Sequence, residues 1–120
     1  MICTTDDPAD DLRWHKAIAA DESFATRVLP AWRPDKAMNI EKPDYAEYLK
    51  KLEAAAGMQI GSFVQLKEAL VCRMDFFGEM GCRASDHALE YVMCVPETEE
   101  GLEAIFAKRL AGAAVSKEEE

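Results

Sequence analysis

The sequence lacks a long hydrophobic run, although apolar residues make up 49% of its 120 residues. A membrane-spanning helix needs about 20 consecutive apolar residues, so we expect no membrane partner. The first seven residues, Met1–Asp7, also lack the basic and then apolar pattern of a signal peptide. These absences predict a soluble, cytoplasmic protein.

Basic residues are scarce as well. Lysine and arginine together number 14, against 23 aspartates and glutamates, which gives a formal net charge of -9. A surface this negative repels phosphate backbones and anionic lipid, so we expect no nucleic-acid partner. The rest of the composition is that of an ordinary globular protein, and the length suits one domain or one piece of a larger domain.

Familiar catalytic and metal-binding motifs are missing too. The sequence contains no glycine-rich phosphate loop, no G-x-S-x-G turn and no H-E-x-x-H helix. Neither of its two histidines lies near two cysteines at ligand spacing, and His15 is expected to be solvated or partly packed on a helix. No C-x-x-C pair occurs among the four cysteines, for which reduced, partly buried thiols are expected: Cys3, Cys72, Cys82 and Cys94.

Three short segments have the character of strands, and helical patterns separate them. The strands are expected at Ile2–Thr5, Phe24–Ala31 and Cys82–Ser85. The helices are expected from Pro8 to about Ala20, from Pro43 to Ala56, from Phe63 to about Phe77, from Ala88 to Met93 and from Thr98 to about Leu110. Such alternation is typical of βαβ units and a parallel sheet.

Local signals support these helices. Asp7 followed by Pro8 is typical of a helix start with an aspartate N-cap, and Ser62 with Gln65 has the spacing of a capping box. Four helices carry stripes of residues at helical spacing that are expected to face the core. The stripes are Trp14, Ala17 and Ile18; Tyr45, Tyr48, Leu49, Leu52 and Ala56; Phe63, Leu66, Leu70, Met74 and Phe77; and Leu102, Ile105, Phe106 and Leu110.

Three parallel strands alone make an incomplete sheet. It has two open edges, and one of its faces is hard to cover in so small a chain. We therefore expect residues 1–120 to form a single partial domain of a larger α/β fold. Open sheet edges also favour self-association of the chain.

Polar residues stand at the end of every expected strand. They are Thr4–Asp7, Trp32–Arg33 and Ser85–His87. The carboxyl ends of parallel strands meet at one edge of a sheet, which is where ligands bind in α/β folds. Three polar ends that converge there predict a functional site.

Each of these residues also has a simpler structural interpretation. Asp7 suits the N-cap of the helix that follows, and Asp86 or Ser85 suits the cap of the next helix. Trp32 suits a packing anchor, and Arg33 an exposed loop charge that pairs with a neighbouring carboxylate. Both interpretations stay open at this point.

Three strings of residues resemble consecutive segments of one enzyme family. They are Ile2–Pro8 (ICTTDDP), Val28–Ala37 (VLPAWRPDKA) and Gly81–Leu89 (GCRASDHAL). In this order they resemble uronate isomerase (glucuronate isomerase), a divergent branch of the amidohydrolase superfamily. The resemblance covers essentially the whole chain.

The resemblance implies a fragment of a (β/α)8 barrel. The three expected strands then resemble its second, third and fourth strands, with a helical insertion at about residues 36–60. The implied activity is aldose–ketose isomerisation in hexuronate breakdown, between D-glucuronate and D-fructuronate and between D-galacturonate and D-tagaturonate. The implied mechanism passes through a cis-enediol near a bound divalent metal, with zinc as the expected ion.

Departures from the family pattern limit what this chain is expected to do alone. The metal-binding H-x-H of the first strand has no counterpart, and the fifth-strand histidine and the eighth-strand aspartate and arginine are absent. We expect the isolated chain to bind no metal and to lack activity. The alternative is a non-catalytic helical interaction module derived from the barrel.

One residue matches a family active-site position, and two more are expected to contact the sugar. Asp86 matches the aspartate that ends the fourth strand, and strand alternation places it above small residues at the barrel mouth. We expect it to be catalytic and to relay a proton between a sugar hydroxyl and the carbonyl. Arg33, which can meet the uronate carboxylate bidentately, and Trp32 are expected to bind the substrate.

Overall fold

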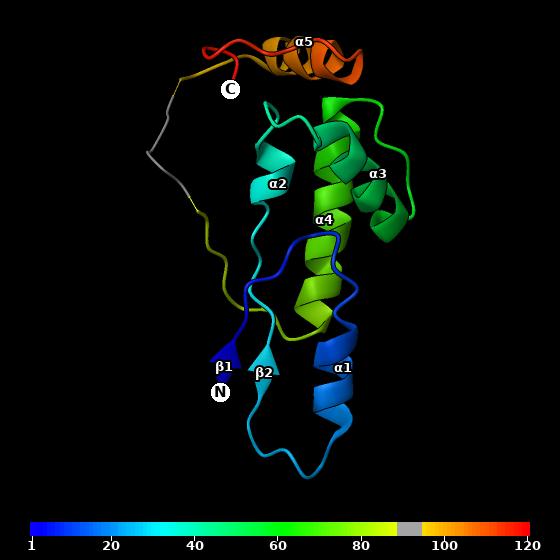
Figure 1. Ribbon diagram of the computed structural model, residues 1–120, viewed down its shortest axis with the longest axis vertical. Helices are drawn as coiled ribbons and strands as arrows, with labels where there is room; N and C mark the ends of the chain where they lie inside the picture. The colour runs from blue at the N-terminus through cyan, green and yellow to red at the C-terminus, as the bar shows by residue number, and fades with distance from the viewer. Residues whose placement is uncertain (89–94) are drawn as a thin grey trace.

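The computed structural model describes residues 1–88 and 95–120 and contains a small parallel sheet (Figure 1). Its strands are β1 (Ile2–Cys3) and β2 (Val28–Leu29), and helix α1 (Arg13–Ala20) lies between them in the chain. Parallel neighbours need such a crossover connection, so the expected βαβ unit is confirmed.

Beyond the strands, parallel pairing continues as single bridges. Trp32 pairs with Asp6 on one side and with Ser85 on the other. The expected third strand over Cys82–Ser85 is wrong, because in the described residues an isolated bridge at Ser85 forms in its place. The ladder between β1 and β2 is interrupted after Leu29, because the Ala31 amide donates to the Asp6 side chain at 3.2 Å and not to a backbone carbonyl of the first strand.

The second strand also begins later than the sequence predicted. Phe24–Ala31 was the expected range, whereas β2 covers Val28–Leu29. The Asp21 carboxylate accepts a hydrogen bond from the Ser23 amide at 2.9 Å, and the Asp21 carbonyl accepts one from the Phe24 amide at 3.1 Å. These bonds make a turn of the segment that follows α1.

Helix α1 begins at Arg13 and not at Pro8. The Asp7 carboxylate accepts the Ala9 amide at 2.9 Å, so Asp7 caps a turn and not the helix. Leu12 then adopts the left-handed conformation, with φ of 52°, which a helix that started at Pro8 would not tolerate. The loop between β1 and α1 is therefore a structured turn.

Four further helices lie in the described part of the chain. They are α2 (Asp35–Met38), α3 (Tyr45–Ala56), α4 (Phe63–Glu79) and α5 (Glu99–Leu110). The sequence predicted the last three within a few residues and did not predict α2. The expected helix over Ala88–Met93 lies, from residue 89 onward, outside the described residues.

The expected starts of α4 and α5 are confirmed in atomic detail. The Ser62 hydroxyl accepts the Gln65 amide at 3.2 Å, and the Thr98 hydroxyl accepts the Gly101 amide at 3.1 Å. The reciprocal half of the capping box differs, because the Gln65 side chain accepts the Gly61 amide at 2.8 Å.

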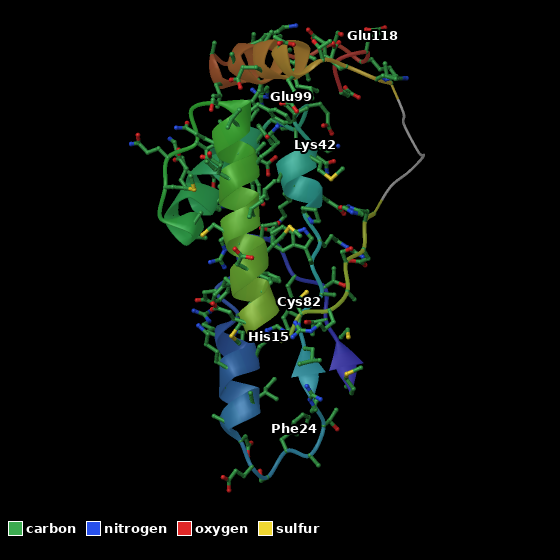
Figure 2. All side chains as sticks on the ribbon, turned by 180° about the vertical axis from the view of Figure 1, so that it is seen from behind. His15, Phe24, Lys42, Cys82, Glu99 and Glu118 are labelled. Atoms are coloured by element: carbon green, nitrogen blue, oxygen red, sulfur yellow. The ribbon has the colours of Figure 1, made fainter. Side chains whose placement is uncertain are left out.

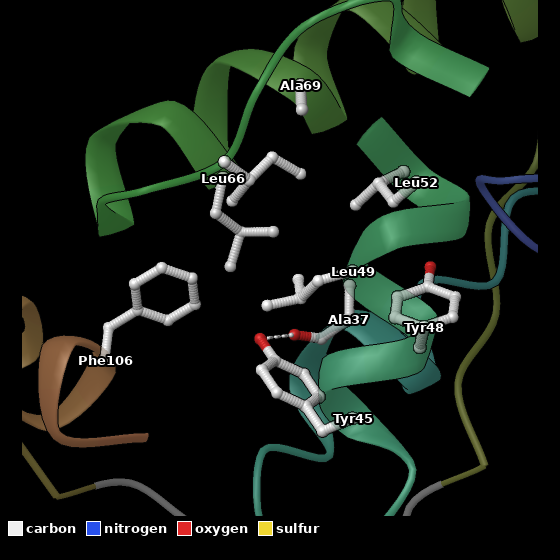
Figure 3. Packing of buried hydrophobic residues seen from close by; sticks show 9 residues of the cluster. Ala37, Tyr45, Tyr48, Leu49, Leu52, Leu66, Ala69 and Phe106 are labelled. Atoms are coloured by element: carbon white, nitrogen blue, oxygen red, sulfur yellow. Dashed lines mark hydrogen bonds between the residues drawn. The ribbon is translucent and has the colours of Figure 1, made fainter. Parts of the chain in front are cut away.

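The main core lies where α2, α3, α4 and α5 meet (Figure 3). The predicted stripe of α3 forms its centre, and the Tyr45 hydroxyl donates to the Ala37 carbonyl at 3.1 Å. The buried members are Ala37, Tyr45, Tyr48, Leu49, Leu52, Ile60, Leu66, Ala69 and Phe106.

A second cluster ties the strand ends to the helices. It consists of Leu12 before α1, Trp32 after β2 and Phe77 near the end of α4. The rings of Trp32 and Phe77 meet edge to face, with their centroids 5.1 Å apart. Such aromatic pairs add packing energy beyond the area they bury, so this cluster fixes the strand ends on the helical layer.

Four residues expected to face the core do not. Trp14 is 68% exposed, Met74 52% and Leu110 38%, and Ala17 is exposed as well. On α4 the buried position belongs to Arg73, which is 7% exposed and donates to backbone carbonyls. An arginine with enough partners can thus occupy a position that a hydrophobic pattern assigns to an apolar residue.

The molecule is long and narrow, with extents of 51 × 31 × 23 Å. The sheet and α1 lie at one end and α5 at the other, with α4 running between them (Figure 1). Figure 2 shows His15 and Cys82 in the half that holds the sheet, far from Glu99 and Glu118. The expected site therefore belongs to the sheet end of the molecule.

Candidate functional site

Two of the expected site residues meet at the carboxyl edge of the sheet. Arg33 directly follows the Trp32 bridge, and Asp86 directly follows the Ser85 bridge. The Arg33 Nε donates to Asp86 Oδ1 at 3.1 Å, and its Nη2 donates to Asp86 Oδ2. The parallel bridge places the two residues side by side, and the arginine holds the carboxylate bidentately.

This ion pair is accessible and electrostatically matched. The Arg33 side chain is 36% exposed and that of Asp86 44%. Hydrogen bonding to Arg33 holds the pKa of the Asp86 carboxyl below its usual value, and the same bond raises the pKa of the Arg33 guanidinium. Asp86 is therefore an ionised carboxylate at neutral pH, next to a fixed positive charge that a second anion can share.

Asp35 and His87 extend the cluster. The Asp35 carboxylate lies 4.0 Å from the Arg33 Nε and 3.2 Å from the His87 Nδ1, and it accepts the Ala88 amide at 2.9 Å. Asp35 thus ties the loop after β2 to the segment after Ser85. The simpler interpretation of Arg33 was a pair with a neighbouring carboxylate, and here the carboxylates of Asp35 and Asp86 both face the guanidinium.

Trp32 lies apart from this pair in the packing of the chain. Its side chain is buried against Phe77, in the layer between strands and helices, and the residue is 8% exposed. It also borders a hollow of about 460 Å³, shared with Pro34, Cys82 and His87. The expectation that Trp32 contacts substrate stays a prediction.

The sequence did not predict a polar network that lies near the end of β1. Thr4 Oγ1 lies 2.6 Å from Asp6 Oδ2 and 2.8 Å from His15 Nε2. Asp6 and His15 are each 9% exposed, so the histidine is buried and not solvated. Thr4 and Asp6 are two residues apart in an extended segment and so share a face, and α1 covers that face.

The described residues provide no metal centre. No group of three or more histidine, cysteine, aspartate or glutamate side chains in residues 1–88 and 95–120 is arranged to hold a metal ion. Both Asp86 carboxylate oxygens face Arg33. The expectation of partly buried thiols holds for Cys82 and is wrong for Cys3 and Cys72, which are exposed, while Cys94 lies outside the described residues.

No helix in the described part of the chain is long and apolar enough to cross a membrane. This agrees with the absence of a long apolar run in the sequence.

Comparison with known proteins gives a consistent result. The family model described as UxaC, glucuronate isomerase, matches residues 1–120. Among curated proteins, the uronate isomerase of Lachnoclostridium phytofermentans is 66% identical over 119 residues, and that of Lachnospira eligens is 60% identical over 119 residues. Each match covers 99% of this chain but only 26% and 25% of the relative, so the chain spans about a quarter of the relatives' length.

Solved structures agree with the sequence matches. The uronate isomerase of Thermotoga maritima superposes with a TM-score of 0.89 at 36% identity, covering 98% of this chain and 26% of that one. The glucuronate isomerase of Caulobacter crescentus superposes with a TM-score of 0.86 at 25% identity, covering 98% of this chain and 24% of that one.

Proposed function

The chain belongs to the glucuronate isomerase family, and on that premise we propose that it acts as part of a uronate isomerase. The reaction would interconvert D-glucuronate and D-fructuronate, and D-galacturonate and D-tagaturonate, in the hexuronate catabolism of the cytoplasm. The match to the family over the whole chain carries this proposal. The Arg33–Asp86 pair supports it, because it supplies an anion-binding group and an ionised carboxylate at one place.

The fold we propose for the whole enzyme is the (β/α)8 barrel of the amidohydrolase superfamily. In it, β1, β2 and the segment that ends at Ser85 are strands two to four, and residues of about 36–60 are a helical insertion. The parallel order of these segments supports this assignment. Residues 1–120 then form one partial domain, and further strands would pair with its open edges.

Arg33 and Asp86 have distinct roles in the proposed reaction. Isomerisation of an aldose to a ketose moves a proton from C2 to C1, while the carbonyl moves from C1 to C2. Arg33 would bind the uronate carboxylate bidentately, and Trp32 would form part of the wall of the substrate pocket. Asp86 would relay a proton between a sugar hydroxyl and the carbonyl oxygen.

A divalent metal, with zinc as the expected ion, belongs to the proposal for the complete enzyme. The described residues do not fit such an ion, since no group of three ligating side chains is assembled and Arg33 occupies both oxygens of Asp86. We therefore assign no step of this chain's chemistry to a metal.

A chimera tests the proposal. Residues 1–120 replace the matching quarter of the Lachnoclostridium phytofermentans enzyme, to which they are 66% identical. The full-length chimera should convert glucuronate, whereas the isolated chain should not, with or without added divalent metal, because proton transfer needs a substrate held by several residues. Within the chimera, Arg33→Lys should raise KM, since lysine cannot form the bidentate contact.

Two outcomes would contradict the proposal. A well-folded chimera without isomerase activity would favour the alternative, a non-catalytic interaction module. Conversion of glucuronate by the isolated chain would show that its site is more complete than proposed. An unchanged KM for Arg33→Lys would mean that Arg33 pairs only with its neighbouring carboxylates.

A further inference from the structure

The network of Thr4, Asp6 and His15 is linked to the Arg33–Asp86 pair by a backbone hydrogen bond between Arg33 and Asp6. We propose that His15 is a positioning residue, which holds the strand ends so that Arg33 meets Asp86 and the substrate in the required geometry. This inference rests on the proposed function and adds to it a positioning role for a residue of α1.

The single hydrogen of the Thr4 hydroxyl determines the direction of its hydrogen bonds with Asp6 and His15. The Thr4 hydroxyl has one hydrogen, which Oγ1 donates to Asp6 Oδ2 at 2.6 Å, with the Leu29 carbonyl as a more distant acceptor at 3.3 Å. The contact between Thr4 Oγ1 and His15 Nε2 at 2.8 Å must then be a donation from the histidine. His15 therefore acts as a donor, and Nε2 carries a hydrogen.

Backbone hydrogen bonds link Asp6, and with it this network, to Arg33. The Asp6 carbonyl accepts the Arg33 amide at 3.0 Å, and the Asp6 amide donates to the Ala31 carbonyl at 2.9 Å. Asp6 Oδ2 also accepts the Ala31 amide at 3.2 Å. Asp6 thus holds both residues that flank Trp32, just where the regular ladder between the two strands ends.

The side-chain bond from Asp6 replaces a missing strand bond. Past Pro30 the chain has no continuous strand to fix its direction, and Arg33 is the first charged residue on that stretch. A carboxylate anchored by Thr4, itself anchored by His15 on α1, gives this stretch a second attachment. The orientation of Arg33 then depends on a histidine that is far from the substrate.

Burial separates this role from catalysis. His15 and Asp6 are each 9% exposed, whereas Arg33 and Asp86 have open side chains. Asp6 Oδ1 lies 3.8 Å from His15 Nε2, so the two side chains also face each other inside the packed layer. A substrate at the Arg33–Asp86 pair does not need to touch either, and their effect must pass through the backbone.

The variants are chosen to separate donation from packing. His15→Met keeps an apolar body of similar size and cannot donate, whereas His15→Gln places an amide N–H near the position of Nε2. Thr4→Val removes the hydroxyl with little change in shape. Lys16→Met is the matched control, because Lys16 is the next residue on α1 and is exposed outside the network.

In the full-length chimera, His15→Met and Thr4→Val should each lower kcat/KM by about tenfold to a hundredfold, the scale expected for small misplacements of a positioned group. The double variant should lose no more than the worse single variant, because both break the same chain of bonds. His15→Gln should restore most of the activity, and Lys16→Met should match the unsubstituted chimera.

Amide hydrogen exchange of the peptide over residues 28–34 gives a readout besides activity. His15→Met should speed exchange in this peptide, while His15→Gln and Lys16→Met should not. Unchanged exchange in His15→Met, or a His15→Gln variant as impaired as His15→Met, overturns the inference. If the unsubstituted chimera is inactive, the proposed function fails, and the exchange measurement still decides whether His15 positions the segment that holds Arg33.

Discussion

At the scale of single residues, the Arg33–Asp86 pair has two interpretations, a surface ion pair or a catalytic group. A carboxylate that is merely paired with an arginine at the surface contributes about 1 kcal/mol of stability or less. A carboxylate that also relays protons contributes about 10²–10⁴-fold in rate. Stability and turnover therefore respond very differently to the loss of Asp86, and the two interpretations of Asp86 can be separated.

We predict that Asp86→Asn in the full-length chimera lowers kcat by about a hundredfold or more, because asparagine cannot exchange the proton. The melting temperature should change little, since the pair is exposed and asparagine caps a helix nearly as well as aspartate. Asp75→Asn on the exposed face of α4 is the control for a lost surface charge. Near-normal kcat in Asp86→Asn would leave Asp86 with a structural role only.

The titration of Asp86 tests the same pair without any activity. Hydrogen bonding to Arg33 lowers the pKa of Asp86 in the folded chain below its ordinary value of 3.8. A depressed carboxyl pKa means that the pair stabilises the fold at pH values above the unfolded pKa, and that this contribution is lost as the pH falls through the folded pKa.

NMR titration of the Asp86 side chain should give a midpoint below 3.8. Arg33→Gln should move the midpoint upward, because the guanidinium that favours the charged form is removed. A midpoint that does not respond to Arg33→Gln would show that the two residues are not paired in solution.

Asp86 and His15 differ in how well the sequence pattern predicted their surroundings. Alternation along Cys82–Asp86 predicted that Asp86 stands at the accessible strand end, and its pairing with Arg33 is consistent with that position. The burial of His15 was not predictable, because its partner Thr4 is 11 residues away in the sequence and directly follows β1. From the sequence alone, a histidine in a polar helix is expected to be solvated, because the segment that packs against it is not known.

At the scale of elements, Arg73 joins three parts of the fold through hydrogen bonds, in addition to the apolar packing. From α4 its guanidinium donates to the Pro8 carbonyl at 2.8 Å, the Asp10 carbonyl at 2.8 Å and the Ala55 carbonyl at 3.0 Å. It also stacks over Phe76, with 4.2 Å between its Cζ and the ring centroid. One buried side chain thus fastens the β1–α1 loop and the end of α3 to α4.

We predict that Arg73→Met destabilises the chain by roughly 3 kcal/mol, because three backbone carbonyls in buried or partly buried bonds lose their donor at once. Thermal unfolding measures the change. Arg83→Met is the control, since Arg83 is exposed and also donates to backbone carbonyls, those of Gly78 and Cys82. It should change stability by about 0.5 kcal/mol or less. Equal effects of the two substitutions would contradict a fastening role for Arg73.

Helices with local signals were predictable, and elements fixed by distant contacts were not. The Ser62 and Thr98 caps and the α3 stripe depend on neighbours three or four residues away, so the sequence contains them directly. The predicted start of α1 at Pro8 was wrong, because an aspartate before a proline suits both a helix cap and a turn. Only the left-handed Leu12, held in a cluster with Trp32 and Phe77, decides between them.

At the scale of the whole molecule, the chain is too extended for a self-contained domain of its length. Its radius of gyration is 16.2 Å, whereas a compact domain of this size has about 13.6 Å. Its accessible surface is 8031 Å², against about 6,500 Å² for a compact monomer of this mass. These differences agree with a chain that spans a quarter of its relatives' length and that lacks part of its packing surface.

In the described residues, the outer edge of β1 has no neighbouring strand. The sheet of the described residues has the order β1–β2, so the outer edge of β1 presents its N–H and C=O groups to solvent. Met1 is 80% exposed and Ile2 54%, and both lie at this edge. An exposed apolar edge strand is a template for pairing with another chain.

We predict that the isolated chain self-associates through this edge, with a mass by light scattering that rises with concentration. Ile2→Lys should reduce the association, because a charge on an edge strand opposes pairing. Val71→Lys on α4 is the matched control, since Val71 is 57% exposed, close to the 54% of Ile2, and the added charge is the same. Equal association of both variants would move the contact away from the sheet, and a strict monomer at high concentration would mean that the open edge is protected in solution.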